Sequence, residues 1–104
     1  MYKVLLYYYY AQIENVDEKV QEHKRFCQAH DILGRVYLTS EGMNGTVSGL
    51  EANIEKYKNY LETDPLFPGI MFKESTHPAH TFKKITVKNK NELVNLSLED
   101  DVNP

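Results

Sequence analysis

The stretch RVYLTSEGMNGTVSG, residues 35–49, carries the pattern that decides the fold. Two short runs rich in Val, Thr, Tyr and Leu flank a Gly-Met-Asn-Gly segment. Asn44 and Gly45 both tolerate positive φ, which is typical of the two central positions of a type I′ turn. The stretch therefore predicts a β-hairpin, with strands at residues 35–39 and about 45–48 and the turn at Asn44 and Gly45.

A strand and a helix are expected before this hairpin, and a helix after it. Residues 2–10 are β-formers without a breaker, which is typical of an interior strand. Asn15 and Glu18 form a capping-box pattern ahead of a helix at residues 16–30. Ser48 and Glu51 repeat that pattern and predict a second helix, which ends where Asp64 precedes Pro65.

The remaining chain predicts a fourth strand at residues 70–73, a loop at 77–80 and an alternating strand at 82–88. A further alternating piece contains Leu96 and Leu98. This order is that of the split βαβ, ferredoxin-like α+β fold. We expect an antiparallel sheet with two helices on one face, because its crossovers are right-handed, and a C-terminal strand appendix. The domain is expected to cover residues 1–98, and residues 99–104 to begin a linker.

Alternation along the strands predicts which side chains face the helices. The aliphatic set is assigned to the helices: Val4, Leu6, Val36, Leu38, Ile70 and Phe72. The opposite face is then expected to show Leu5, Tyr7, Tyr9, Arg35, Tyr37, Met71 and Lys73. Four of these, Tyr7, Tyr9, Arg35 and Tyr37, form a mixed aromatic and basic surface that is either solvated or a docking face.

Composition narrows the classes of function. The chain has 104 residues, a net charge of −3 and one cysteine, Cys27, so no internal disulfide can form. The apolar N-terminal run is too short to span a bilayer and lacks a signal-peptide cleavage pattern. We expect a cytoplasmic protein with no membrane partner. Residues 75–91 hold Lys83, Lys84, Lys88 and Lys90 and no acidic residue.

The residue types with catalytic chemistry are scattered over different predicted elements. Cys27 is expected to be a small core residue, and the HxxH pair His77 and His80 is a weak metal signal. No catalytic residue, metal site or cofactor is therefore predicted. The four lysines either contact phosphate groups or form a solvated strand face.

Two known activities of ferredoxin-like domains are disfavoured by the sequence. The loop after the first strand, AQIENVD, lacks the glycine and arginine that acylphosphatases use there. The expected third strand, GTVSG, lacks the aromatic residues with which an RNA recognition motif stacks bases on that strand.

Five stretches, spread from residue 4 to residue 104, resemble a known family, and the resemblance covers essentially the whole chain. They are VLLYYYY (4–10), EHKRFCQAHDILGRVYLTSEGMNGTVSG (22–49), DPLFPGIMFKES (64–75), FKKITVKNKNELVNL (82–96) and LEDDVNP (98–104). The chain resembles the N-terminal domain of the rhodanese-related tRNA uridine hydroxylases. The resemblance implies an acylphosphatase-like, ferredoxin-like fold. It also implies an oxidoreductase role in tRNA modification, the oxygen-dependent hydroxylation of the wobble uridine to 5-hydroxyuridine.

In that family a rhodanese domain with the reactive cysteine follows the DVNP motif, and Cys27 does not match that cysteine. The resemblance therefore implies tRNA and a rhodanese domain in cis as partners, and no activity for this chain alone. Two functions stay open. The domain helps to bind or position tRNA, with Lys83, Lys84, Lys88 and Lys90 facing RNA, or it packs on the rhodanese domain without touching RNA.

Overall fold

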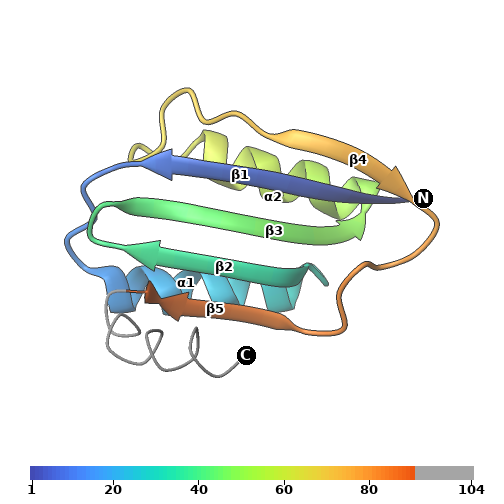
Figure 1. Ribbon diagram of the computed structural model, residues 1–104, viewed down its shortest axis with the longest axis horizontal. Helices are drawn as coiled ribbons and strands as arrows, with labels where there is room; N and C mark the ends of the chain where they lie inside the picture. The colour runs from blue at the N-terminus through green and yellow to red at the C-terminus, as the bar shows by residue number, and fades with distance from the viewer. Residues whose placement is uncertain (91–104) are drawn as a thin grey trace, which may run out of the picture.

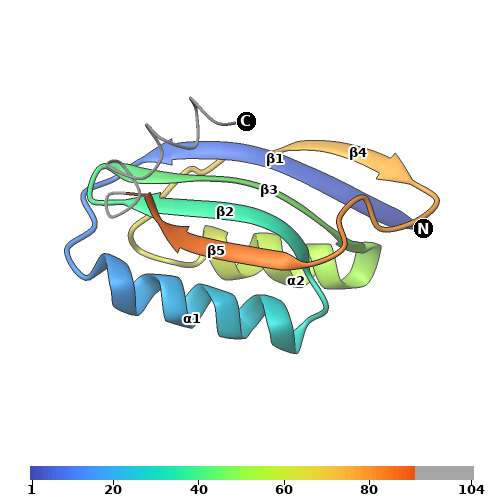
Figure 2. The same ribbon diagram turned by 60° about the horizontal axis from the view of Figure 1, so that its bottom comes forward.

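The structure, a computed structural model, describes residues 1–90. This part of the chain forms a five-stranded sheet that is covered on one face by two helices (Figures 1 and 2). The elements, in chain order, are β1 (Tyr2–Tyr10), α1 (Val16–Ala29), β2 (Leu33–Thr39), β3 (Gly42–Leu50), α2 (Glu51–Glu62), β4 (Lys73–His77) and β5 (Ile85–Asn89). The strand order is β4-β1-β3-β2-β5. The ferredoxin-like prediction is confirmed.

The C-terminal strand appendix is β5, which adds to the edge of the sheet beside β2. It pairs with β2 in parallel, whereas β1–β3, β1–β4 and β2–β3 are antiparallel, so the sheet is mixed. Helix α1 packs against β2 and β5, and α2 against β1 and β3, so both helices lie below the sheet in Figure 2. The predicted strand piece at Leu96 and Leu98 and the domain boundary at residue 98 lie outside the described residues.

The hairpin exists, but its turn is not at Asn44 and Gly45. Thr39 pairs with Gly42, so Ser40 and Glu41 form the turn, and Asn44 and Gly45 lie inside β3. Thr39 Oγ1 accepts a hydrogen bond of 2.9 Å from the Glu41 amide. Gly42 is the glycine that the turn requires, because its φ is +157° and a Cβ there would lie 2.2 Å from the Tyr9 carbonyl oxygen. The two strands are therefore longer than predicted.

Both predicted capping boxes are wrong. Asn15 is the N-cap residue of α1, which begins at Val16 as predicted, but its side chain makes no capping hydrogen bond. Ser48 cannot cap α2, because β3 continues to Leu50, which pairs with Tyr2, and α2 begins only at Glu51. The serine hydroxyl is instead hydrogen-bonded to His80.

The predicted fourth strand at residues 70–73 is displaced. The observed strand, β4, starts at Lys73, and the connection before it is a compact turn in which the Leu66 amide donates to Asp64 Oδ1 at 2.9 Å. Phe67 and Ile70 are buried there and belong to the hydrophobic core. The exposed polar sequence KESTH suits an edge strand.

The faces of β1 are the reverse of the prediction. Leu5 and Tyr7 are buried at 0% and 4% exposure, whereas Leu6 is 50% exposed. Tyr7 pairs with Gly45, which pairs with Val36, so all three side-chain positions face the helices. The assignment of Val36 and Leu38 to the core is confirmed, because both are fully buried. Residues 4–10 are apolar or aromatic at both parities, so their alternation contains no information about which face is inside.

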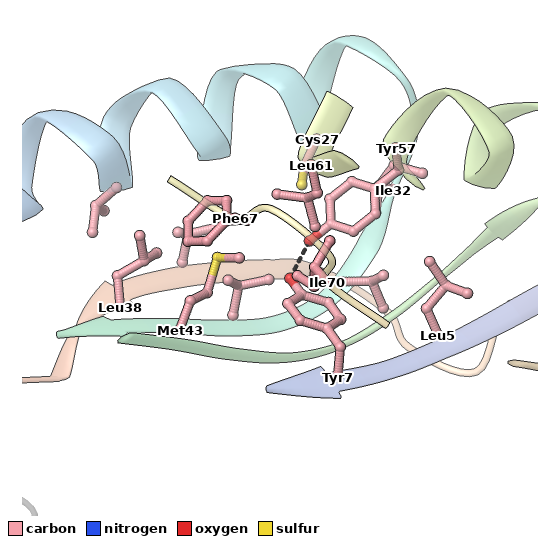
Figure 3. Close-up of a cluster of buried hydrophobic side chains, with 14 of the residues drawn as sticks. Leu5, Tyr7, Cys27, Ile32, Leu38, Met43, Tyr57, Leu61, Phe67 and Ile70 are labelled. Carbon is pink, nitrogen blue, oxygen red and sulfur yellow. Dashed lines mark hydrogen bonds between the residues drawn. The ribbon is translucent and has the colours of Figure 1, made fainter. Parts of the chain in front are cut away.

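Tyr7 lies in the core, where its hydroxyl is hydrogen-bonded to that of Tyr57 (Figure 3). Tyr57 is also bonded to His23 Nε2 at 2.7 Å, which forms a buried polar chain from the sheet to both helices. Burial raises the pKa of Tyr57 and of Tyr7, and it lowers the pKa of His23 to about 4. Cys27 is fully buried nearby, as predicted, and burial raises the pKa of its thiol to about 12.

Candidate nucleic-acid interface

The sheet face turned away from the helices carries one continuous row of polar and aromatic residues. The strand registers place Tyr8 beside Asn44, Asn44 beside Tyr37, and Tyr37 beside Lys88. The row thus crosses four neighbouring strands, β1, β3, β2 and β5 (Figure 1). A second row runs Lys73, Leu6, Thr46, Arg35 and Thr86. We call this surface the open face.

The predicted docking residues divide between the two sides of the sheet. Arg35 and Tyr37 lie on the open face, as expected. Tyr7 and Tyr9 do not: Tyr7 is buried, and Tyr9 is half-buried, with its hydroxyl donating to the Pro68 carbonyl at 2.6 Å. Their placement on the exposed side is wrong. Tyr8 and Tyr10 occupy that side instead, at 71% and 80% exposure.

The lysine set borders the same face. Lys88 is exposed in the row beside Tyr37, and the Lys90 ammonium lies 4.8 Å from the centroid of the Tyr37 ring. Lys83 and Lys84 are exposed in the connection before β5, and the Lys84 carbonyl accepts a hydrogen bond from the Gly34 amide at 2.9 Å. The structure therefore brings together the lysine edge and the Arg35–Tyr37 surface, which the sequence presented as separate candidates.

Three shallow hollows meet at Asn44. One of about 230 Å³ lies between Tyr8 and Tyr10 on one side and Tyr37 on the other. A second, of about 260 Å³, is lined by Arg35, Tyr37 and Phe82. The third and most apolar, about 670 Å³, extends from Asn44 over Leu6 and Tyr8 to Met71 and Lys73. Asn44 lines all three, and it is exposed at the centre of the open face.

Cations dominate the charge of the open face. Arg35, Lys73, Lys88 and Lys90 lie on it or at its edge, and Glu41 is the acidic residue at the hairpin end. Within residues 1–90, no carboxylate lies within 4.0 Å of any of these four cations. The lysines that do form ion pairs with Glu74 and Asp64 belong to other surfaces. The open face can therefore offer its positive charge to an anionic partner.

Sequence reasoning missed Tyr8, Tyr10 and Asn44 as surface residues. The signal that would have found Asn44 lies in β3, where Met43, Gly45 and Val47 alternate with Asn44, Thr46 and Ser48. Reading that alternation over the whole of β3 places Asn44 on the polar side. This alternation was missed because Asn44 and Gly45 also match the central positions of a type I′ turn. Residues 4–10 contain no such signal for Tyr8 and Tyr10.

A Ser-His-Asp grouping also forms, which the sequence did not predict. Ser48 Oγ lies 3.0 Å from His80 Nδ1, and His80 Nε2 lies 3.6 Å from Asp31 Oδ2. Ser48 is 0% exposed, so a substrate cannot reach its hydroxyl. The grouping holds the connection before β5 against the sheet, where the His80 ring also packs on Tyr2.

The connection after β1 does not resemble a phosphate site. A hollow of about 370 Å³ there is lined by Glu14, Glu18 and Glu22, with Lys19 as the basic residue. Lys19 is bound to Asp64 at 2.5 Å and to Glu22 at 3.1 Å. Carboxylates would repel an acyl phosphate, so this surface disfavours acylphosphatase chemistry.

Two further observations concern metal ligands and membrane-spanning helices. Among residues 1–90, no three His, Cys, Asp or Glu side chains are grouped as metal ligands would be. Neither α1 nor α2, the helices of that part of the chain, has the length and apolar character needed to cross a membrane.

Solved structures of low sequence identity share this fold. Klebsiella pneumoniae BlrP1 with FMN and cyclic diGMP matches 96% of this chain and 29% of its own, with a TM-score of 0.75 and 14% identity. BlrB, a BLUF protein, in its dark state, matches 94% of this chain and 80% of its own, with a TM-score of 0.69 and 17% identity. At such identities the likeness shows the fold alone.

Curated relatives are much closer in sequence. A tRNA uridine(34) hydroxylase of Bacillus cytotoxicus is 48% identical over 103 residues, and one of Acholeplasma laidlawii is 50% identical over 103 residues. Each alignment covers 99% of this chain and 32% of the relative, so the chain spans about a third of the length of these relatives. The family model described as the UPF0176 acylphosphatase-like domain matches residues 2–93. The expected resemblance is confirmed: the chain belongs to the UPF0176 acylphosphatase-like domain family.

Proposed function

We propose that this chain is a non-catalytic domain of an oxygen-dependent tRNA wobble-uridine hydroxylase and that it helps to bind or position tRNA. The observation that supports this is the open face, where Arg35, Lys88 and Lys90 surround Tyr37 without carboxylate partners among residues 1–90. Phosphate contacts by lysine and arginine supply most of the non-specific affinity for nucleic acids. The relatives named tRNA uridine(34) hydroxylase supply the substrate class.

In this proposal the chemistry belongs to another part of the enzyme. Cys27 is buried and holds its proton, and Ser48 is inaccessible, so neither is a nucleophile. A rhodanese domain in cis would carry the reactive cysteine, and this domain would contribute no cofactor. The relatives are about three times as long as the matched segment, which leaves room for such a domain. The complete enzyme would act in the cytoplasm, where its tRNA is found.

The experiment is a charge reversal in a full-length enzyme that contains this domain. Lys84→Glu with Lys88→Glu should raise the apparent KM for tRNA severalfold and leave kcat nearly unchanged. A control with Lys24→Glu and Lys56→Glu makes the same charge change on the helix layer. An unchanged KM in the first variant, or an equal rise in the control, would contradict a specific role for the lysine edge.

A second function is favoured by exposed apolar side chains on β1 and ahead of β4. Leu6 and Met71 are 50% and 83% exposed and line one hollow, a pattern typical of protein contact surfaces. The domain would then pack on the rhodanese domain without touching RNA. In that case Leu6→Glu with Met71→Glu should lower the thermal stability of the full-length enzyme, while the lysine variants leave the KM for tRNA unchanged.

A further inference from the structure

We infer that the open face binds single-stranded RNA, with an unpaired base held between Tyr8 and Tyr37 and its polar edge hydrogen-bonded to Asn44. This inference rests on the proposed function and deepens it, because it names the form of RNA and the residues that would read a base. The lysines alone would recognise any nucleic acid, whereas this row can recognise only a base that is free of its partner.

The spacing of the row fits one planar base. Tyr8 and Tyr37 flank Asn44 across two strand intervals, a separation of roughly 9–10 Å at the backbone. A base in van der Waals contact with a ring on each side needs about 7–8 Å between the ring planes. The hollow of about 230 Å³ between these tyrosines has Asn44 among its lining residues. The exposed Tyr8 ring makes an edge contact with Tyr10, at 5.9 Å between ring centroids, and would turn from it toward Tyr37 to hold a base.

The polar groups in this row are free to bind a ligand. Within residues 1–90, the Asn44 carboxamide has no hydrogen-bond partner. The Tyr8 hydroxyl has none there either, so no hydrogen bond holds the ring in place, and the proposed contact uses the ring alone. By contrast, the hydroxyls of the inward-facing Tyr7 and Tyr9 are both bonded. A carboxamide offers a donor and an acceptor side by side, which suits the edge of a nucleobase.

The surrounding charge favours RNA over an apolar partner at this row. Lys88 continues the row beyond Tyr37, and the Lys90 ammonium lies over the same ring, so cations lie next to the proposed base slot. Arg35 lines the adjoining hollow. Stacking of unpaired bases on aromatic rings, combined with basic groups along the backbone, is the general mode of single-strand binding. A duplex would meet only the cations, because its bases are already stacked and paired.

The test uses the 104-residue chain and two RNA probes of the same sequence, a ten-nucleotide single strand and its duplex. NMR titration at low salt reports both the affinity and the residues that shift. We expect the single strand to bind at least about fivefold more tightly than the duplex, with shifts at Tyr8, Tyr37 and Asn44. Tyr8→Ala should weaken single-strand binding by about fivefold or more, since one stacked base contributes that much. Asn44→Ala should weaken it by about threefold to tenfold, since it removes the hydrogen bonds to the base edge.

Two variants separate stacking from general damage to the surface. Tyr8→Phe keeps the ring and should keep the affinity. Asn59→Ala removes an exposed carboxamide on α2, on the other side of the molecule, and should have no effect. Equal loss in Tyr8→Phe and Tyr8→Ala would contradict stacking.

The outcomes separate the inference from the proposed function. If both RNAs bind equally, and Lys88→Glu weakens binding while Tyr8→Ala does not, the base slot is wrong and the tRNA role stands. If neither RNA shifts any residue, the inference is overturned, and the KM experiment decides the proposed function independently. Shifts that depend on protein concentration alone would assign the open face to a second copy and overturn the inference.

Discussion

Replacing Gly45 with alanine should destabilise the domain through a collision with Tyr7, not through backbone conformation. Gly45 was expected to need a positive φ in a turn, but it lies in β3, and its φ is not positive. A Cβ at Gly45 would lie 2.6 Å from the Tyr7 hydroxyl oxygen and 2.7 Å from Cζ. The ring cannot move freely, because Tyr7 is buried and hydrogen-bonded to Tyr57.

The expected magnitude has two parts. Overpacking a core by a methyl group costs about 1–3 kcal/mol. Displacing Tyr7 from Tyr57 would weaken a buried hydrogen bond worth about 1 kcal/mol. We therefore expect Gly45→Ala to lower the free energy of unfolding by about 2–4 kcal/mol and the melting temperature by at least about 8 °C. The larger Gly45→Val should cost more, since it adds further atoms at the same place.

The assay is urea unfolding of the 104-residue chain, followed by circular dichroism. Gly45→Ala with Tyr7→Leu should lose less stability than the sum of the two single variants, by about 1–2 kcal/mol, because leucine vacates the space that the alanine methyl needs. Asn44→Ala is the control: it alters the next residue of β3 on the open face and should change stability by less than about 0.5 kcal/mol. A Gly45→Ala protein as stable as this control, or strictly additive losses in the double variant, would refute the collision.

Three further predictions follow from the buried groups and the charged face. Burial lowers the pKa of His23 from 6.5 to about 4, so between these pH values the unfolded chain binds a proton that the folded chain does not. The contribution of His23 to stability should therefore be constant above about pH 6.5 and fall by about 1.4 kcal/mol per pH unit from there towards pH 4. His23→Gln should reduce that loss, which urea midpoints at pH 7 and pH 5 would measure; an identical pH dependence in the variant would contradict the assignment. Cys27 should resist a thiol reagent at pH 8 in the folded protein and react on unfolding, and reaction of the native state at the rate of a free thiol would place it outside the core. If RNA binding neutralises about three phosphates, the logarithm of affinity should fall with the logarithm of salt concentration at a slope of roughly −2 to −3, and Lys88→Glu should bring the slope closer to zero by about one; a flat salt dependence would argue against phosphate contacts.

The element order and the fold class could be predicted because each depends on local patterns that agree with one another. In α1, for example, Val16, Val20, His23 and Cys27 recur at helical spacing, and all four are buried. Element ends were less certain, because capping and turn motifs also occur inside strands. Ser48 and Asn44 show this: each matches a local motif, and each lies in β3 because long-range pairing with β1 and β2 extends that strand.

The sequence predicted one part of the open face correctly and the other part wrongly. Arg35, Tyr37, Lys88 and Lys90 were identified, since a basic residue in a polar strand face is visible in the sequence. The tyrosines of β1 were assigned to the wrong sides, because residues 4–10 are apolar or aromatic at both parities. The pairing of Tyr7 with Gly45, a residue without a side chain, leaves room for the Tyr7 ring in the core.

This same pairing explains how a ferredoxin-like sheet can offer a stacking surface without aromatic residues on its central strand. Once Tyr7 occupies the space above Gly45, the register turns Tyr8 outward beside Asn44, and β2 supplies Tyr37 on the far side. The absence of aromatic residues from β3 therefore excludes stacking on that strand but not on the sheet. In this arrangement β3 contributes Asn44 between two rings, so the residue that would read the base edge lies at the centre of the open face, and the rings that would hold the base lie on its neighbours.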